Sequence, residues 1–364
     1  MFRFRTGFCA LIILALFATA GFSAGLTDSL KPGKADIKSA GVMAFGPEGI
    51  LFVGDPAGAA IFAFDTQDRT ASQAAPVDIK GINDKVAAML GTTADQILIN
   101  DLAVNPISKK MYLSVSRGRG PTAAPVIIRV DTKGKIEQFS TDNVGLSKVV
   151  LPNPPASQAN QGQRDPRMNA ITDLAYVDGK ILIAGLSNEE FASTLRSVAF
   201  PFQQANKGAG IEIWHGSHGR FETQAPIRTF VSYKIKNEEN ILASYTCTPL
   251  VKIPVSSLQA GAKVKGTTIA ELGAGNQPLD MISYTQNGHA YILMNNSNRG
   301  VMKLTADSLE NYKPITAPSD VAGVPYTTIK ELQGILQLDK VDEKMGAILA
   351  QSGSSMDLKT IALP

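Results

Sequence analysis

Short apolar strands alternate with tight polar turns along most of the chain, and one arrangement of them recurs. An apolar strand leads into a turn rich in Gly, Asn and Asp, and a stronger apolar strand follows it and ends in Gly, Ser, Asn or Asp. The clearest copies cover 42–55, 102–118, 174–188, 281–296 and 335–353, and a weaker copy covers 241–255. Alternating apolar positions joined by hairpin turns predict antiparallel β-sheet.

A further strand with regular alternation follows most copies of this repeat. These strands lie at 60–65, 126–131, 210–214 and 301–304. Repeats of roughly 40 to 70 residues that each form a small antiparallel sheet are typical of β-propellers. The pattern therefore predicts an all-β chain with a single β-propeller domain over residues 25–364, of six blades or, as the alternative, seven.

The chain ends and two intervening segments complete this prediction. A propeller must join its ends, so we expect the N-terminal segment Leu30–Lys38 to lie in one blade with the C-terminal strand Asp357–Leu363. A short helix is expected after Asn83 and before Gly91. The segment Asn188–Gln204 begins with acidic residues that suit a first helical turn, and it is long enough to form a lid.

Three short segments carry a resemblance to a known family. Gly49–Asp55 reads GILFVGD, Ile61–Asp65 reads IFAFD and Asp101–Pro106 reads DLAVNP. In these segments the chain resembles secreted bacterial β-propellers of the broad NHL, YVTN and senescence-marker-protein/gluconolactonase-like type. The resemblance implies the fold and no activity, because this fold hosts many functions. Lactonase-like members have a Glu metal ligand early in the chain, whereas Glu48 is expected in a turn on the wrong face.

The first 24 residues have the pattern of a secretory signal peptide. Arg3 and Arg5 precede an apolar run over 8–17, and the small residues that follow predict cleavage after Ala20 or Ala24. The apolar run is shorter than the ~20 residues that span a bilayer. We therefore expect a periplasmic or secreted protein with no membrane association after cleavage.

The charge balance excludes one class of partner. The chain has 35 Lys and Arg residues against 32 Asp and Glu residues, a formal charge of +3, and cleavage removes two arginines and no acid. A nucleic-acid-binding protein has a strongly basic field, so no nucleic-acid partner is expected. The expected partner is a small molecule or a periplasmic or extracellular protein.

Three aspartates are the candidate metal ligands. Asp101, Asp173 and Asp280 each come directly before a strand expected to line the central channel. Three carboxylates around one channel mouth would repel one another, and a hard cation such as Ca²⁺ or Mg²⁺ would relieve the repulsion. The alternative is that each Asp caps nearby backbone N–H groups in its own blade, as Asp often does in turns.

Further polar residues are expected on the loops of the same face. Arginines on tight turns could bind a carboxylate or phosphate through two hydrogen bonds, or they could be solvated loop charges. The candidate ligand-binding residues are Arg117, Arg119, Asn188, Glu189, Arg196, Asn295, Asn296 and Arg299.

The histidines and the cysteine leave their roles open. His215 and His218 form an H-x-x-H turn, which is either a polar hairpin or a weak transition-metal site, and His289 lies in another turn. Both turns are expected on the face opposite the aspartates, so no Ser–His–Asp triad is predicted. Cys247 is either a small buried hydrophobic residue or a reactive thiol or soft-metal ligand.

These patterns rank three functions. The first is an exported, non-catalytic propeller that binds a small ligand or a protein on its loop-rich face. The second is a lactonase-like hydrolase that uses a divalent metal ion at the channel mouth to activate water. The third, by analogy of fold, is an accessory protein to periplasmic redox enzymes.

Overall fold

The structure is a computed structural model that describes residues 25–158 and 165–364. The predicted signal peptide, with its cleavage points after Ala20 or Ala24, lies outside the described residues. Over the two described ranges, no helix has the length and apolar character needed to cross a membrane.

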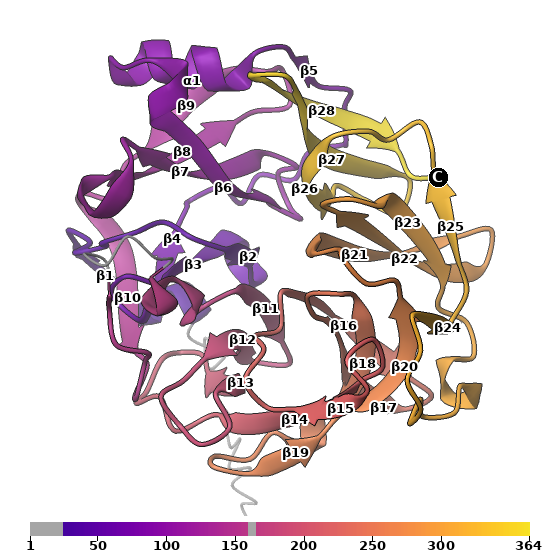
Figure 1. Cartoon of the computed structure of the whole chain (residues 1–364). Helices are drawn as coiled ribbons and strands as arrows, with labels where there is room; N and C mark the ends of the chain where they lie inside the picture. The colour runs from indigo at the N-terminus through magenta and orange to yellow at the C-terminus, as the bar shows by residue number, and fades with distance from the viewer. Residues whose placement is uncertain (1–24, 159–164) are drawn as a thin grey trace, which may run out of the picture.

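Six antiparallel sheets form a ring around a central channel, so the predicted six-bladed β-propeller is confirmed (Figure 1). Blade 1 contains β2 (Met43–Phe45), β3 (Ile50–Asp55) and β4 (Ala60–Asp65), joined by β10 (Val144–Val150) and β1 (Lys31–Gly33). Blade 2 contains β6 (Ile97–Val104), β7 (Met111–Arg117), β8 (Ala124–Val130) and β9 (Ile136–Phe139). Blade 3 contains β11 (Asp173–Val177), β12 (Lys180–Leu186), β13 (Ser193–Ala199) and β14 (Ala209–His215), extended by β15 (Arg220–Glu222) and β19 (Lys263–Lys265).

The other three blades follow along the chain. Blade 4 contains β16 (Thr229–Ile235), β17 (Glu238–Ser244), β18 (Pro249–Pro254), β20 (Thr267–Leu272) and β24 (Val321–Gly323). Blade 5 contains β21 (Pro278–Gln286), β22 (His289–Asn296), β23 (Gly300–Thr305) and β25 (Tyr326–Ile329). Blade 6 contains β26 (Ile335–Lys340), β27 (Met345–Ser352), β28 (Ser355–Ala362) and β5 (Asp78–Ile79).

Helices are few, as the sequence predicts. The α-helix α1 (Ile82–Leu90) packs on β28 at the rim, and its C-cap Gly91 adopts a left-handed conformation, with φ at 65°, which glycine accommodates without strain. Short 3-10 helices are η1 (Leu26–Ser29), η2 (Pro47–Gly49), η3 (Ala94–Gln96), η4 (Gly120–Thr122), η5 (Pro166–Asn169), η6 (Val255–Ser257) and η7 (Leu309–Asn311).

The blades do not follow one another around the ring in chain order. The channel-facing strand of blade 2 contacts those of blade 1 and blade 6, and the channel-facing strand of blade 1 contacts that of blade 3. Blade 2 therefore sits between the last blade and the first one (Figure 1). After blade 2 the chain returns to blade 1, where β10 pairs with β4, before it continues to blade 3.

A buried polar cluster holds the segment that crosses blade 2 on its way from β4 to β5. Asp68, which is 5% exposed, accepts hydrogen bonds from Ser108 Oγ at 2.6 Å and Tyr112 OH at 3.1 Å, and it forms an ion pair with Lys110 at 2.7 Å. The side-chain amide of Asn105 donates to the Asp68 carbonyl at 2.9 Å. These partners belong to β7 and to the turn before it, so the cluster fixes the crossing segment to blade 2.

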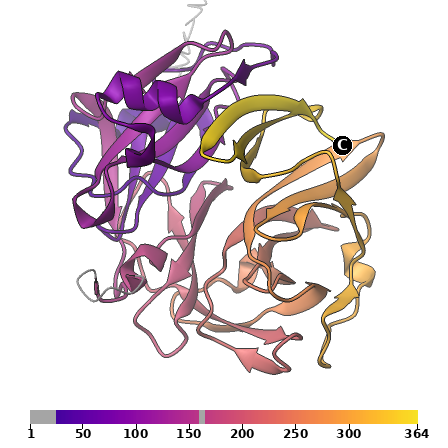
Figure 2. The same ribbon diagram turned by 45° about the horizontal axis from the view of Figure 1, so that its top comes forward.

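The ring closes with a different N-terminal partner from the one expected. The C-terminal strand β28 pairs with β27 and with β5, at Leu358 with Ile79 and Lys359 with Asp78. The prediction for Leu30–Lys38 was wrong, because β1 in that segment pairs with β10 in blade 1. In both views the C-terminal strands lie beside α1, which follows β5 (Figure 2).

The middle of the segment expected to form a lid is part of the sheet. Residues 193–199 form β13, which pairs with β12 over seven positions, and no helix forms there. Phe200 follows β13 and packs edge-to-face on Phe52 of blade 1, with ring centroids 4.9 Å apart. Alternation over 193–199 is weak because both faces of β13 are buried, which obscures the period of two. The prediction of a helix in this segment was therefore wrong.

Candidate functional site

A cavity of about 700 Å³ opens at one mouth of the channel. Its floor is formed where the channel-facing strands begin, and among the described residues it includes Asp101, Asp173 and Asp280. The sequence prediction placed these three residues at one channel mouth, and the structure brings them there.

Each of these aspartates also holds two blades together. Asp101 Oδ2 of blade 2 accepts from the backbone N–H of Met43 in blade 1 at 2.6 Å. Asp173 Oδ2 of blade 3 accepts from the N–H of Phe230 in blade 4 at 2.6 Å. Asp280 Oδ2 of blade 5 accepts from the N–H of Leu338 in blade 6 at 2.8 Å. The aspartates cap backbone N–H groups as expected, but these N–H groups include ones from the neighbouring blade and not only from the same blade.

A fourth aspartate, missed by the sequence analysis, completes this set. Asp339 of blade 6 accepts from the N–H of Val104 in blade 2 at 2.6 Å. Both sides of the transposed blade 2 are therefore fastened by a carboxylate, through Asp101 and Asp339. Asp339 lies within a strand, after Leu338, so the pattern of an Asp directly before an apolar strand does not find it.

Burial and mutual repulsion keep the pKa values of these carboxyl groups high. Burial in the channel wall raises the pKa of Asp173 to about 7 and that of Asp339 to about 6. Burial, with the neighbouring negative charge of Asp173, raises the pKa of Asp101 well above its usual value. Burial and the charge of Asp101 do the same for the pKa of Asp280. Near neutral pH these four carboxyl groups are therefore only partly ionised.

The hydrogen bonds do not favour a shared calcium or magnesium ion. Both oxygens of Asp173 accept backbone N–H bonds, the second from Leu174 at 2.7 Å, and both oxygens of Asp280 do the same, the second from Met281 at 2.8 Å. Within the described ranges, the group of three His, Cys, Asp or Glu residues whose ligand atoms converge lies elsewhere and contains no aspartate. The carboxylates fit the role of interblade fasteners better than that of a Ca²⁺ cage.

The walls of the cavity carry arginines and side-chain amides. Arg228, missed by the sequence analysis, donates to Asn169 Oδ1 at 3.0 Å and to Gln277 Oε1 at 3.3 Å. Arg167, also missed, donates to the carbonyl of Pro155 from Nε and to that of Ala57 from Nη1 at 3.4 Å. Both arginines line the cavity, and most of the groups that accept their hydrogen bonds belong to residues that line it too.

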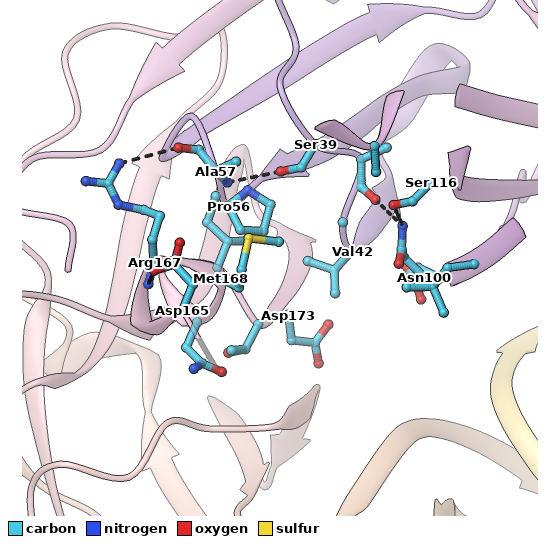
Figure 3. A pocket seen from close by; sticks show the side chains of 18 of the residues that line it. Ser39, Val42, Pro56, Ala57, Asn100, Ser116, Asp165, Arg167, Met168 and Asp173 are labelled. Carbon is cyan, nitrogen blue, oxygen red and sulfur yellow. Dashed lines mark hydrogen bonds between the residues drawn. The ribbon is translucent and has the colours of Figure 1, made fainter. Parts of the chain in front are cut away.

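Apolar side chains give the cavity a mixed character. Met168 and Leu98 both line it and are 48% and 40% exposed, which places them among the most exposed large apolar residues described. Figure 3 shows Met168 and Asp173 between Arg167 on one side and Asn100 on the other. The Asn100 amide donates to the carbonyl of Ala40 at 2.8 Å and to Ser116 Oγ at 3.0 Å. The cavity is therefore lined both by polar side chains held in hydrogen bonds and by exposed apolar side chains.

The predicted ligand-binding residues do not form one site. Arg119 lines the channel-mouth cavity and is held by the carbonyls of Asp95 and Ile97, whereas Arg117 is exposed at the end of β7 and is not among the residues that line the cavity. In blade 5, Asn295 donates to the carbonyl of Ile335 at 3.1 Å, Asn296 to that of Met294 at 3.3 Å, and Arg299 to that of Ala274 at 3.0 Å. These three side chains stabilise the sheet and its turns.

A smaller, separate cavity of about 140 Å³ collects residues from the expected lid. Glu189 lines this cavity and accepts a hydrogen bond from the Asn153 amide at 2.5 Å. The neighbouring residue Asn188 does not line the cavity. Arg196 is 2% exposed, and burial lowers its pKa to about 10. Among the described residues its Nη2 reaches the Pro152 carbonyl at 3.4 Å, while Nε and Nη1 have no partner.

The H-x-x-H turn lies on the channel-mouth face and not on the opposite one. The alternation over 210–214 predicts the third strand of its blade, but β13 is the third strand and β14 is the fourth, so β14 runs in the opposite direction and ends at the channel-mouth face. The backbone N–H of Gly216 in this turn donates to Glu271 of blade 4, close to the end of β20. The predicted placement of His215 and His218 was therefore wrong.

Comparisons with known proteins identify no family for this chain. No protein-family model matches the sequence, and no curated protein matches it. Among solved structures, a glucose dehydrogenase-type oxidoreductase of Thermus thermophilus matches with 11% identity and a TM-score of 0.33, over 91% of this chain and 99% of that one.

A gluconolactonase of Xanthomonas campestris matches with 10% identity and a TM-score of 0.33, over 91% and 88% of the two chains. Drosophila Plexin A, in complex with Semaphorin 1b, matches with 9% identity and a TM-score of 0.40, over 92% and 88%. Alignments this weak carry no argument about this chain, and the chain is a six-bladed β-propeller on the evidence of its own sheets.

Proposed function

We propose that this chain is an exported binding protein whose channel mouth takes up a small, neutral or cationic organic molecule rich in hydroxyl groups. The observation that carries the proposal is the cavity of about 700 Å³ with buried and half-buried carboxyl groups as its floor. Export rests on the signal-peptide pattern of the first 24 residues.

The chemistry of the lining supports this class of ligand. A hydroxyl group donates one hydrogen bond and accepts others, so it is matched by carboxyl oxygens below it and by amide and guanidinium groups beside it. The floor supplies Asp173 and Asp280, and the walls supply Arg167 and Arg228. An anion would meet carboxyl groups at the floor, so the proposal disfavours it.

The geometry supports binding more than hydrolysis. The described lining contains aspartate and arginine as its charged residues and no His, Glu or Lys. The aspartates are held by backbone N–H groups in the interblade contacts, so the fold fixes their positions. Rigid polar groups around an open cavity are what a binding site requires.

A ligand screen with rim variants tests the proposal. We expect calorimetry to detect binding of neutral polyols, sugars or amino alcohols, and no binding of dicarboxylates. Met168→Arg should weaken that binding at least tenfold, because a guanidinium group at the rim would occupy the cavity and repel a cation. Val321→Arg is the matched control, since Val321 is an exposed apolar residue (58%) on β24 outside the cavity lining. Binding of anions alone, or equal affinity in both variants, would contradict the proposal.

The hydrolase hypothesis makes an opposite prediction about metal ions. The repulsion between Asp101 and Asp280 is the observation that favours a bound cation. On the binding proposal, millimolar Ca²⁺ or Mg²⁺ should leave the melting temperature unchanged, because among the described residues the aspartate oxygens do not belong to the group of ligand atoms that converges. A rise that Asp173→Asn abolishes would instead support the metal-dependent hydrolase.

A further inference from the structure

Two blades bring three metal-binding side chains together on the channel-mouth face. His215 ends β14 and His218 lies in the turn after it, both in blade 3, whereas Cys247 lies in the turn between β17 and β18 in blade 4. One ligand atom of each residue lies within 4.8 Å of those of the other two. The rings of His215 and His218 face each other with centroids 3.9 Å apart.

A single carboxylate orients both imidazole rings. Glu222 of β15 lies 2.8 Å from His215 Nδ1 through Oε2 and 2.7 Å from His218 Nδ1 through Oε1. Arg220 Nε also donates to Glu222, at 3.0 Å. Because a carboxylate accepts hydrogen bonds, each Nδ1 carries the proton and each Nε2 keeps its lone pair. A carboxylate behind a histidine is the usual arrangement around protein-bound zinc.

An unpartnered buried atom points independently to a ligand. His215 is 2% exposed, and its Nε2 has no hydrogen-bond partner among the described residues. Glu271 of β20, which accepts from the Gly216 N–H at 2.6 Å, has a buried Oε2 that is also without a partner there. Buried polar atoms without partners cost folding free energy, so such atoms in a native fold call for a ligand.

The position of Cys247 is fixed by its turn. Cys247 and Thr248 both have left-handed backbone conformations, with φ values of 63° and 55°. Cys247 N–H donates to the Asn276 carbonyl at 2.6 Å, and Thr248 Oγ1 donates to the Gly273 carbonyl at 2.9 Å. These bonds hold the thiol beside the two histidines, and Cys247 is the free cysteine of the described chain.

We propose that His215, His218 and Cys247 bind a borderline transition-metal ion of the Zn²⁺ class and thereby join blade 3 to blade 4. Two imidazole nitrogens and a thiolate are ligands that Zn²⁺ and Co²⁺ prefer, and a fourth position stays open to water. Ligand atoms around tetrahedral zinc lie about 3.5 Å apart. The side chain of His218 is 42% exposed, so it can move inward to reach that separation.

Spectroscopy on the whole chain tests the site directly. Trp214 is the single tryptophan and precedes His215, so bound Co²⁺ should quench its fluorescence, and thiolate-to-cobalt charge transfer should add near-ultraviolet absorption. His218→Ala and Cys247→Ser should each weaken Co²⁺ and Zn²⁺ binding at least tenfold. His289→Ala is the matched control, because His289 also pairs with a carboxylate, Asp307, but lies in blade 5. Equal binding by all these variants would overturn the proposal.

Thiol protection decides the matter if Cys247→Ser fails to fold. Zn²⁺ should slow the alkylation of Cys247 in the wild-type chain at least tenfold, measured by mass spectrometry of the peptide that contains it. His218→Ala should abolish this protection, and His289→Ala should leave it intact. Alkylation at the same rate with and without Zn²⁺ in the wild-type chain would show that the thiol is not a ligand.

Discussion

A chain that ends after Ser355 should lose its cooperative thermal unfolding. This truncation removes nearly all of β28, which pairs with β27 on one side and with β5 on the other. It also removes Leu358, a fully buried residue that packs between blade 6 and the residues around α1. Because β5 and β28 are the joint that closes the ring, an open sheet edge and an open core remain after truncation. Differential scanning calorimetry and far-ultraviolet circular dichroism measure the effect.

A second truncation, after Ala362, is the control for this prediction. It keeps all of β28 and removes Leu363 and the terminal Pro364, whose carbonyl accepts from Tyr284 OH and Lys303 Nζ. We expect this shorter truncation to unfold cooperatively at a moderately lower temperature. If the chain that ends after Ser355 melts at the wild-type temperature, the ring is not held closed by β28.

The free energy of unfolding should fall as the pH rises from 5 to 8. The folded pKa values of Asp173 and Asp339, about 7 and about 6, lie above the ordinary value of 3.8. The folded state therefore binds protons more tightly than the unfolded state, and this contribution is complete below about pH 4 and is lost as the pH passes through 6 and 7. The loss between pH 5 and pH 8 should be on the order of 2–4 kcal/mol, measured by urea denaturation.

Substitutions at Asp173 separate its charge from its hydrogen bonds. Asp173→Asn removes the ionisation, so the fall in stability between pH 5 and pH 8 should become clearly smaller. Asp173→Ala leaves the N–H groups of Leu174 and Phe230 without their partner, which should cost about 1–3 kcal/mol for each at either pH. Asp178→Asn, in an exposed turn of the same blade, is the control. Stability that rises between pH 5 and pH 8 in the wild-type chain would contradict the prediction.

The repeat and its hairpins were readable from the sequence because each blade buries alternate positions of its own strands. That local pattern gives the number of blades and the channel-facing strands, and with them the positions of Asp101 and Asp280. The order of the blades around the ring was not readable. Asp68 ties the crossing segment to blade 2 through a buried cluster, and hydrophobic periodicity does not predict a contact between residues some forty positions apart.

The site was partly readable for the same reason. An Asp before an apolar strand has a local pattern, whereas Arg167 and Arg228 reach the cavity from loops whose course depends on the neighbouring blades. The pairing of Cys247 with His215 also depends on blade 3 meeting blade 4. A signal was present in the H-x-x-H turn and in Glu222, which comes four residues after His218. Once β14 is recognised as the fourth strand of blade 3, the turn with His215 and His218 is expected on the same face as Cys247.

The transposition of blade 2 has a consequence for the chain as it is synthesised. The outer edge of β4 can be covered only when β10 has emerged, after all of blade 2, and β5 must wait for β28 near the end of the chain. At a translation rate of about 5–20 residues per second, the edge of β4 stays unpaired for several seconds until β10 is made, and β5 stays unpaired for considerably longer until β28 is made. Nascent chains of intermediate length therefore present unpaired strands, and a holding chaperone has most to protect while residues 66–143 are being translated.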